Sequence, residues 1–199
     1  MTTIPQFIDA VSNLHREKDA AYGNSWKKRG ELISIMANIA RKVDRLEVVL
    51  NGAQTSRDES LIDTVVDLLV YSLKYLTFLA DQDPKVDRLL FGANPTLEAR
   101  PRSDGTDALD WLLRTLDTTP LATPAADLGE TTRRTIAAYE RLERLVRRKP
   151  DPAEFGERAE LARALIGATT ALLGAVREAE PVDWDSFVET WRARPKVHP

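Results

Sequence analysis

The chain of 199 residues contains no cysteine and only two histidines. The lack of cysteine excludes disulfide bonds, thiolate zinc sites and cysteine nucleophiles. His15 falls in the first helical segment and His198 in the C-terminal tail, and neither has an obvious carboxylate partner in the sequence. Nucleophilic triads and histidine-based metal sites are therefore not expected.

Positive charge is not in excess, since 28 Lys and Arg residues face 31 Asp and Glu residues. A net charge of -3 argues against a non-specific DNA-binding protein, so direct contact with nucleic acid is not expected. The longest apolar run, residues 65–73, is interrupted by Asp67 and too short to span a membrane. Residues 1–6 lack the pattern of a signal peptide. These observations predict a soluble, cytoplasmic protein that does not enter a membrane.

Three motifs that are typical of nucleotide-binding and zinc sites are also missing. The sequence has no G-x-x-x-x-G-K-[ST] loop, no G-x-G-x-x-G turn and no H-E-x-x-H pair. The usual P-loop, dinucleotide-binding and zinc-protease sites are therefore not indicated.

The periodicity of apolar residues is helical along almost the whole chain. Leu32, Met36, Ile39, Val43 and Leu46 illustrate it, because they follow each other at intervals of three and four. No segment has the alternation of a strand. The sequence predicts an all-α helical bundle, with helices over residues 5–21, 32–50, 107–116, 127–149, 152–179 and 183–193. A further helix, capped by Ser56 or Asp58, is expected to run to about residue 81.

The distribution of prolines suggests a division of the chain. Residues 84–106 include Pro95 and Pro101 and few apolar repeats, which is typical of a linker. We therefore expect a helical domain over residues 1–83 and a C-terminal helical region of unknown role over residues 107–199.

A row of charged residues marks the helix over residues 61–79. At about 100° per residue, Asp63, Asp67 and Lys74 fall within roughly 40° of each other. The rest of this helix is apolar, which is typical of a helix buried on more than one side. Two carboxylates one turn apart can share a Mg²⁺ ion. Alternatively, Asp63 pairs with an arginine and Asp67 with Lys74 or Arg45.

Basic and aromatic residues upstream suggest a place for a phosphate-bearing ligand. Lys27, Lys28 and Arg29 precede Gly30 and the start of a helix, where free amide groups favour anions. Tyr22 and Trp26 can stack on a base, or they can be core aromatics.

Three segments together carry a resemblance to a known family. They are residues 21–31 (AYGNSWKKRGE), 38–46 (NIARKVDRL) and 63–69 (DTVVDLL). They resemble nucleotide-modification-associated domain proteins of phages and bacteria, which look like distant members of the MazG-like all-α nucleoside triphosphate pyrophosphatase superfamily. The resemblance covers residues 19–79. It implies a MazG-like N-terminal half that acts as a homo-oligomer such as a dimer, with Mg²⁺ on four acids of two helices and pyrophosphate as a product.

The superfamily pattern, E-x-x-E on one helix and E-x-x-D on the next, fits this chain in part. Asp63 matches the final acid, but Ser60 stands where another acid belongs, and Arg41 and Asp44 fall at the earlier pair. A shifted set keeps the chemistry. In this set the metal ligands are Asp44, Glu47, Asp63 and Asp67, Glu59 orients the attacking water, phosphate meets Lys28, Arg29, Lys42 and Lys74, and the base meets Tyr22 and Trp26.

Three functions are compatible with these patterns. The first is a Mg²⁺-dependent nucleoside triphosphate pyrophosphohydrolase, or a related phosphohydrolase, acting on ribo- or deoxynucleotides. The second is a nucleotide-binding protein without hydrolysis, or an accessory protein in nucleotide or DNA modification. The third is a helical interaction protein whose acid–base rows are salt bridges between subunits.

Overall fold

The computed structural model describes residues 2–23, 27–28, 30–52, 60–92, 97, 101–123, 126–148 and 151–193. Within these ranges the chain is helical and has no strand. The prediction of an all-α helical bundle is therefore confirmed.

The first three long helices lie close to their predicted positions: α1 is Ile4–Tyr22, α2 is Glu31–Leu50 and α3 is Leu61–Gln82. Capping residues fix the first and third starts. The Thr3 hydroxyl accepts a hydrogen bond from the Gln6 amide, and the Ser60 hydroxyl accepts one from the Asp63 amide. Ser60, rather than the predicted Ser56 or Asp58, caps α3; those two residues lie outside the described ranges.

The second half of the chain forms α5 (Asp107–Arg114), α7 (Leu128–Val146), α8 (Phe155–Ala179) and α9 (Pro181–Arg192). Two short turns of helix join them, α6 (Thr119–Ala122) and the 3₁₀ turn η2 (Pro152–Glu154).

One expectation was wrong, because helix α4 (Pro84–Phe91) occupies the first part of the predicted linker. The Asp83 side chain accepts a hydrogen bond of 2.8 Å from the Lys85 amide and so caps α4. Pro84 takes the first helical position, where a missing amide hydrogen does no harm. The same dipeptide that ends α3 therefore starts the next helix.

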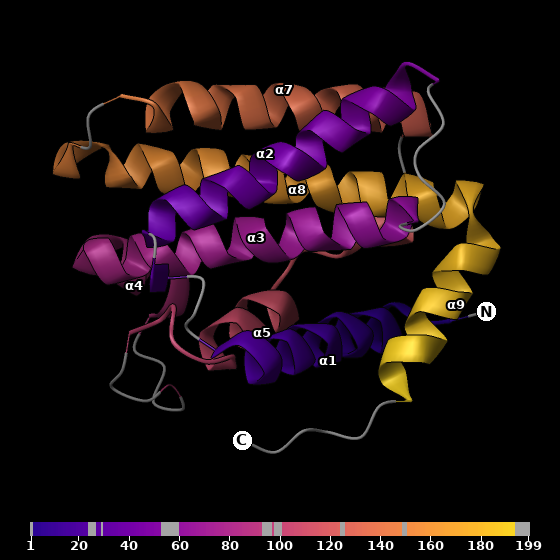
Figure 1. Ribbon diagram of the computed structural model, residues 1–199, viewed down its shortest axis with the longest axis horizontal. Coiled ribbons are helices and arrows are strands. Elements are labelled where there is room, and N and C mark those ends of the chain that lie inside the picture. The colour runs from indigo at the N-terminus through magenta and orange to yellow at the C-terminus, as the bar shows by residue number, and fades with distance from the viewer. Residues whose placement is uncertain are drawn as a thin grey trace.

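Helices α3 and α8 form the centre of the bundle, with α2 and α7 alongside and α1, α5 and α9 around the rest of α3 (Figure 1). One hydrophobic cluster includes residues on both sides of the predicted linker, such as Leu69 of α3 and Leu165 of α8. Helix α8 is long and apolar enough to cross a membrane by length and composition alone, but 61% of that window is buried. Burial of this extent is what the central helix of a bundle requires.

Polar and aromatic contacts hold α1 against α9 and α5. Phe7 stacks on Trp184 of α9 with ring centroids 4.3 Å apart. The buried carboxylate of Asp110 on α5 accepts hydrogen bonds of 2.5 Å from the Ser12 hydroxyl and from the Arg16 guanidinium. These contacts place the second half of α1 against the polar row of α3.

Candidate functional site

The polar row of α3 meets α1 and α2 at Asp67. Its two carboxylate oxygens form ion pairs with Lys18 of α1 at 2.7 Å and with Lys42 of α2 at 2.9 Å. Lys42 is buried, with 9% of its surface exposed. Of the alternatives left open by the sequence, pairing of Asp67 is therefore what the structure contains, although the partners are Lys18 and Lys42 rather than Lys74 or Arg45.

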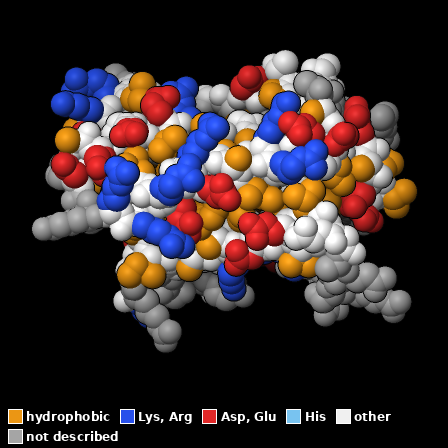
Figure 2. Space-filling view, turned by 90° about the horizontal axis from the view of Figure 1, so that it is seen from above, with side chains coloured by type: hydrophobic (Ala, Val, Ile, Leu, Met, Phe, Trp, Pro, Cys, Tyr) orange, Lys and Arg blue, Asp and Glu red, His pale blue; other side chains and the backbone are white. Residues whose placement is uncertain are grey.

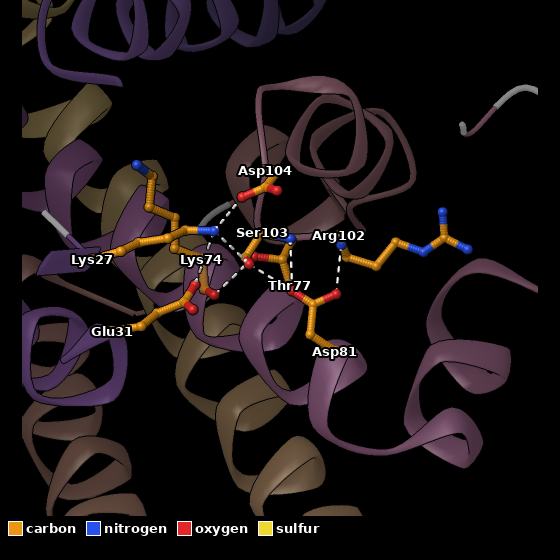
Figure 3. A network of polar contacts seen from close by, with 8 residues as sticks. All are labelled: Lys27, Glu31, Lys74, Thr77, Asp81, Arg102, Ser103 and Asp104. Atoms are coloured by element: carbon orange, nitrogen blue, oxygen red, sulfur yellow. Dashed lines mark hydrogen bonds and ion pairs between the residues drawn. The ribbon is translucent and has the colours of Figure 1, made fainter. Parts of the chain in front are cut away.

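A second set of contacts lies further along α3. The Lys27 ammonium is 2.5 Å from an Asp104 carboxylate oxygen, 2.8 Å from the Ser103 hydroxyl and 3.6 Å from a Glu31 carboxylate oxygen. Gly30 makes this approach feasible, since its φ of 101° turns the chain sharply before α2. Lys74 of α3 lies near enough to Lys27 for their charges to interact, and its side chain points away from the Lys27–Asp104 pair (Figure 3). We call Lys18, Lys27, Lys42 and Lys74 the lysine cluster.

Lys74 is largely buried among charges of both signs. Burial lowers the pKa of its ammonium, and the neighbouring Lys27 and Lys18 lower it further. Asp19 and Glu31 act in the opposite direction without cancelling the effect.

His15 of α1 lies in the same environment. Its side chain is buried, and neither ring nitrogen has a hydrogen-bond partner among the described residues. Burial lowers the pKa of His15 to about 3, and the nearby charges of Lys74, Arg16 and Lys18 contribute to this shift. The imidazole is therefore uncharged at neutral pH, inside an electropositive region.

The predicted metal ligands do not gather around Asp67. Asp63 belongs to the cap of α3, where its carboxylate accepts a 2.7 Å hydrogen bond from the Ser60 hydroxyl. It also lines a cavity of about 340 Å³ that faces α9. Asp63 is therefore occupied by a local structural role at the end of α3.

Asp44 and Glu47 are exposed on the side of α2 that faces α7. Asp44 lies near enough to Tyr139 of α7 to contribute to that side chain's raised pKa, although burial is the main cause. Glu47 lines a groove of about 280 Å³ with Arg133 and Glu140 of α7. The face above α2 and α7 mixes acidic, basic and hydrophobic side chains (Figure 2).

The described residues do not fit the implied magnesium site. Within the described ranges, no three Asp, Glu or His side chains lie close enough together to hold a metal ion. Asp67, the one predicted ligand inside the lysine cluster, is already bound by two ammonium groups. Glu59, the predicted catalytic residue, lies outside the described residues.

The residues predicted to bind phosphate and the base lie in different places. Lys42 and Lys74 belong to the lysine cluster, whereas Lys28 is exposed. Arg29, Trp26 and the side chain of Tyr22 lie outside what the structure describes.

Sequence reasoning missed two members of the site on α1. Lys18 had a usable signal, because it continues the apolar series Phe7, Val11 and Leu14 at the spacing of a helix and so lies on the same side of α1. His15 had no such signal, because the sequence does not show that Lys74 of α3 lies near it. Asp104 was missed because it comes from a segment distant in sequence.

Comparison with known proteins gives one partial similarity. No family model matches the chain, and no solved structure matches it. The Gene 30 protein of Bacillus phage SP01 is 34% identical over 109 residues. The match covers 44% of this chain and 48% of the phage protein, so the chain spans about half the length of that relative.

Proposed function

We propose that this chain binds the phosphate groups of a nucleotide at the lysine cluster. The observation that supports the proposal is that Lys18 and Lys42 hold two ammonium groups 2.7 and 2.9 Å from the oxygen atoms of one carboxylate, with the buried Lys74 and His15 close by. An ammonium group whose pKa is lowered mainly by burial is stabilised when an anion with several charges approaches. Polyphosphate groups supply that charge in a compact form.

In the proposed complex, phosphate oxygens replace the carboxylate of Asp67 between Lys18 and Lys42. Asp67 already holds both ammonium groups within 3 Å of oxygen atoms, so the two cations are positioned for a bidentate anion. Lys74 and Lys27 extend the same cationic region toward the C-terminal end of α3. A ligand with two or three linked phosphates is therefore favoured over one with a single negative charge.

Binding without hydrolysis is favoured over the pyrophosphohydrolase reaction. The lysine cluster supplies cations for a phosphate chain, whereas the acids that a magnesium-dependent reaction requires are not assembled among the described residues. Hydrolysis, a homo-oligomeric state and a role in nucleotide or DNA modification stay predictions from the sequence.

The experiment measures melting temperature with a panel of nucleoside and deoxynucleoside triphosphates, each with Mg²⁺ and with a chelator. Pyrophosphate and phosphate release are followed in the same samples. We expect stabilisation with and without Mg²⁺, and no product release. Substitution Lys42→Met is expected to remove the stabilisation.

The matched control is Lys85→Met, which removes an exposed lysine of α4 and is expected to keep the stabilisation. Absence of a melting shift with every nucleotide would contradict the proposal. Metal-dependent release of pyrophosphate would instead favour the hydrolase.

A further inference from the structure

Residues 101–104, which we call the strap, are fixed to the end of α3. The Asp81 carboxylate accepts hydrogen bonds from the Arg102 amide at 2.5 Å, the Ser103 amide at 3.0 Å and the Ser103 hydroxyl at 2.5 Å. Two successive amides that share one carboxylate fix the direction of the strap (Figure 3).

The side chain of Arg102 adds a second attachment on α4. Its Nε lies 2.6 Å from a carboxylate oxygen of Asp87, and its guanidinium carbon lies 5.1 Å from the centre of the Phe91 ring. The strap is therefore also held on α4, by contacts of Arg102 that do not involve the lysine cluster.

Asp104, the last residue of the strap, contacts Lys27 of the lysine cluster. Asp104 and Lys27 form an ion pair of 2.5 Å, and their side chains are 34% and 20% exposed. The Ser103 hydroxyl contributes a further 2.8 Å contact to the same ammonium. Two oxygen atoms of the strap thus accept hydrogen bonds from the Lys27 ammonium, as oxygen atoms of a phosphate group would.

We propose that the strap is an internal competitor for the anionic ligand, with Asp104 occupying Lys27 until a ligand phosphate displaces it. The inference rests on the proposed function, because it assigns a regulatory contact to the same site. A carboxylate carries one negative charge, whereas a terminal phosphate carries up to two, so a di- or triphosphate has the advantage in this exchange. The strap therefore selects against weakly charged anions.

The test measures the affinity of inorganic tripolyphosphate and of dATP by isothermal titration calorimetry at low salt. Asp104→Asn is expected to raise affinity by about three- to tenfold, because a neutral amide competes poorly for Lys27. Asp9→Asn is the matched control, since it removes an exposed acid of α1 and changes the net charge equally. It is expected to leave affinity within twofold of the wild type.

A second substitution separates competition from a general charge effect. In the Lys27→Met background, Asp104→Asn is expected to give no gain, because the contact it releases is already absent. A gain that persists in this background would overturn the inference, as would unchanged or weaker binding by Asp104→Asn in a wild-type protein that binds both probes. Absence of binding by the wild type and by Asp104→Asn would overturn the proposed function itself.

Discussion

Arg158 of α8 and Lys74 of α3 are both cationic side chains inside the bundle, but their surroundings differ. Arg158 is 1% exposed, forms an ion pair of 3.3 Å with Glu154 and donates a 3.4 Å hydrogen bond to the Leu145 carbonyl near the end of α7. Its guanidinium also lies 6.0 Å from the centre of the Phe155 ring. These groups come from the end of α7, from the turn η2 and from the first residue of α8.

Lys74 is surrounded by charged groups from several elements. The charges around it come from α1, α2 and the residues before α2, and they include two further lysines. Arg158 therefore uses its charge to join the start of α8 to the end of α7. The carbonyl groups at the end of α7 favour a cation. Under the proposed function, Lys74 instead uses its charge to bind a ligand phosphate.

The largest expected effect is on stability, from removal of Arg158. Arg158→Ala removes the ion pair with Glu154 and one of the hydrogen bonds to the Leu145 carbonyl, and it opens space in the core, so we expect a loss of about 3 kcal/mol in the free energy of unfolding. Urea denaturation measures it. Arg163→Ala, on an exposed position of the same helix, serves as the control and is expected to change the value by less than about 1 kcal/mol. Equal losses in the two variants would remove the distinction drawn for Arg158.

The next effect is a pH dependence that His15 introduces. The pKa of His15 is about 3 in the folded protein and 6.5 in the unfolded chain, so the unfolded state takes up the proton first as pH falls. Its contribution to stability is complete above pH 6.5 and decreases between about pH 6.5 and 3. At about 1.4 kcal/mol per pH unit, lowering the pH from 6.5 to 5 is expected to cost about 2 kcal/mol.

Comparison with His15→Leu isolates this contribution. The variant is expected to lose less stability than the wild type over the same pH range, by about 2 kcal/mol, in urea denaturation at each pH. Parallel pH profiles for the two proteins would mean that the imidazole is not held uncharged beside Lys74, Arg16 and Lys18.

The smallest effect on stability is expected at Lys74. Lys74→Met removes a partly buried charge and keeps a similar volume, so the free energy of unfolding is expected to change by less than about 1 kcal/mol. Nucleotide affinity is expected to fall about tenfold, which calorimetry with dATP measures. A large loss of stability with unchanged affinity would place Lys74 with Arg158 as a structural cation.

The sequence predicted much of the fold because its signals are local. The intervals of three and four between apolar residues located the long helices, and the row of Asp67 and Lys74 on α3 correctly indicated a polar face. The Asp83-Pro84 pair misled because the same residues that end one helix can cap the next. The identity of these two residues alone does not show whether they only end one helix or also start the next.

The candidate site was less predictable because its partners come from separate segments. Asp67 was expected to bind a metal or to pair with Lys74 or Arg45, but α1 brings Lys18 to it and α2 brings Lys42. Asp44 and Glu47 are on the same helix as Lys42 and lie on another side of it, where α7 is the neighbour. The angle at which α2 crosses α3 decides which residues of α2 approach Asp67.

By itself the sequence determined that the protein is helical, which faces of the long helices are apolar, and that charged residues form rows on the helices of the first half. Only the tertiary structure decided which of these charges meet. It brought His15 into an electropositive interior and Asp104 onto Lys27, across 77 positions of the chain. The physical reason is that helical periodicity is a property of neighbours in sequence, whereas the field at an ionisable group sums charges from every element packed around it.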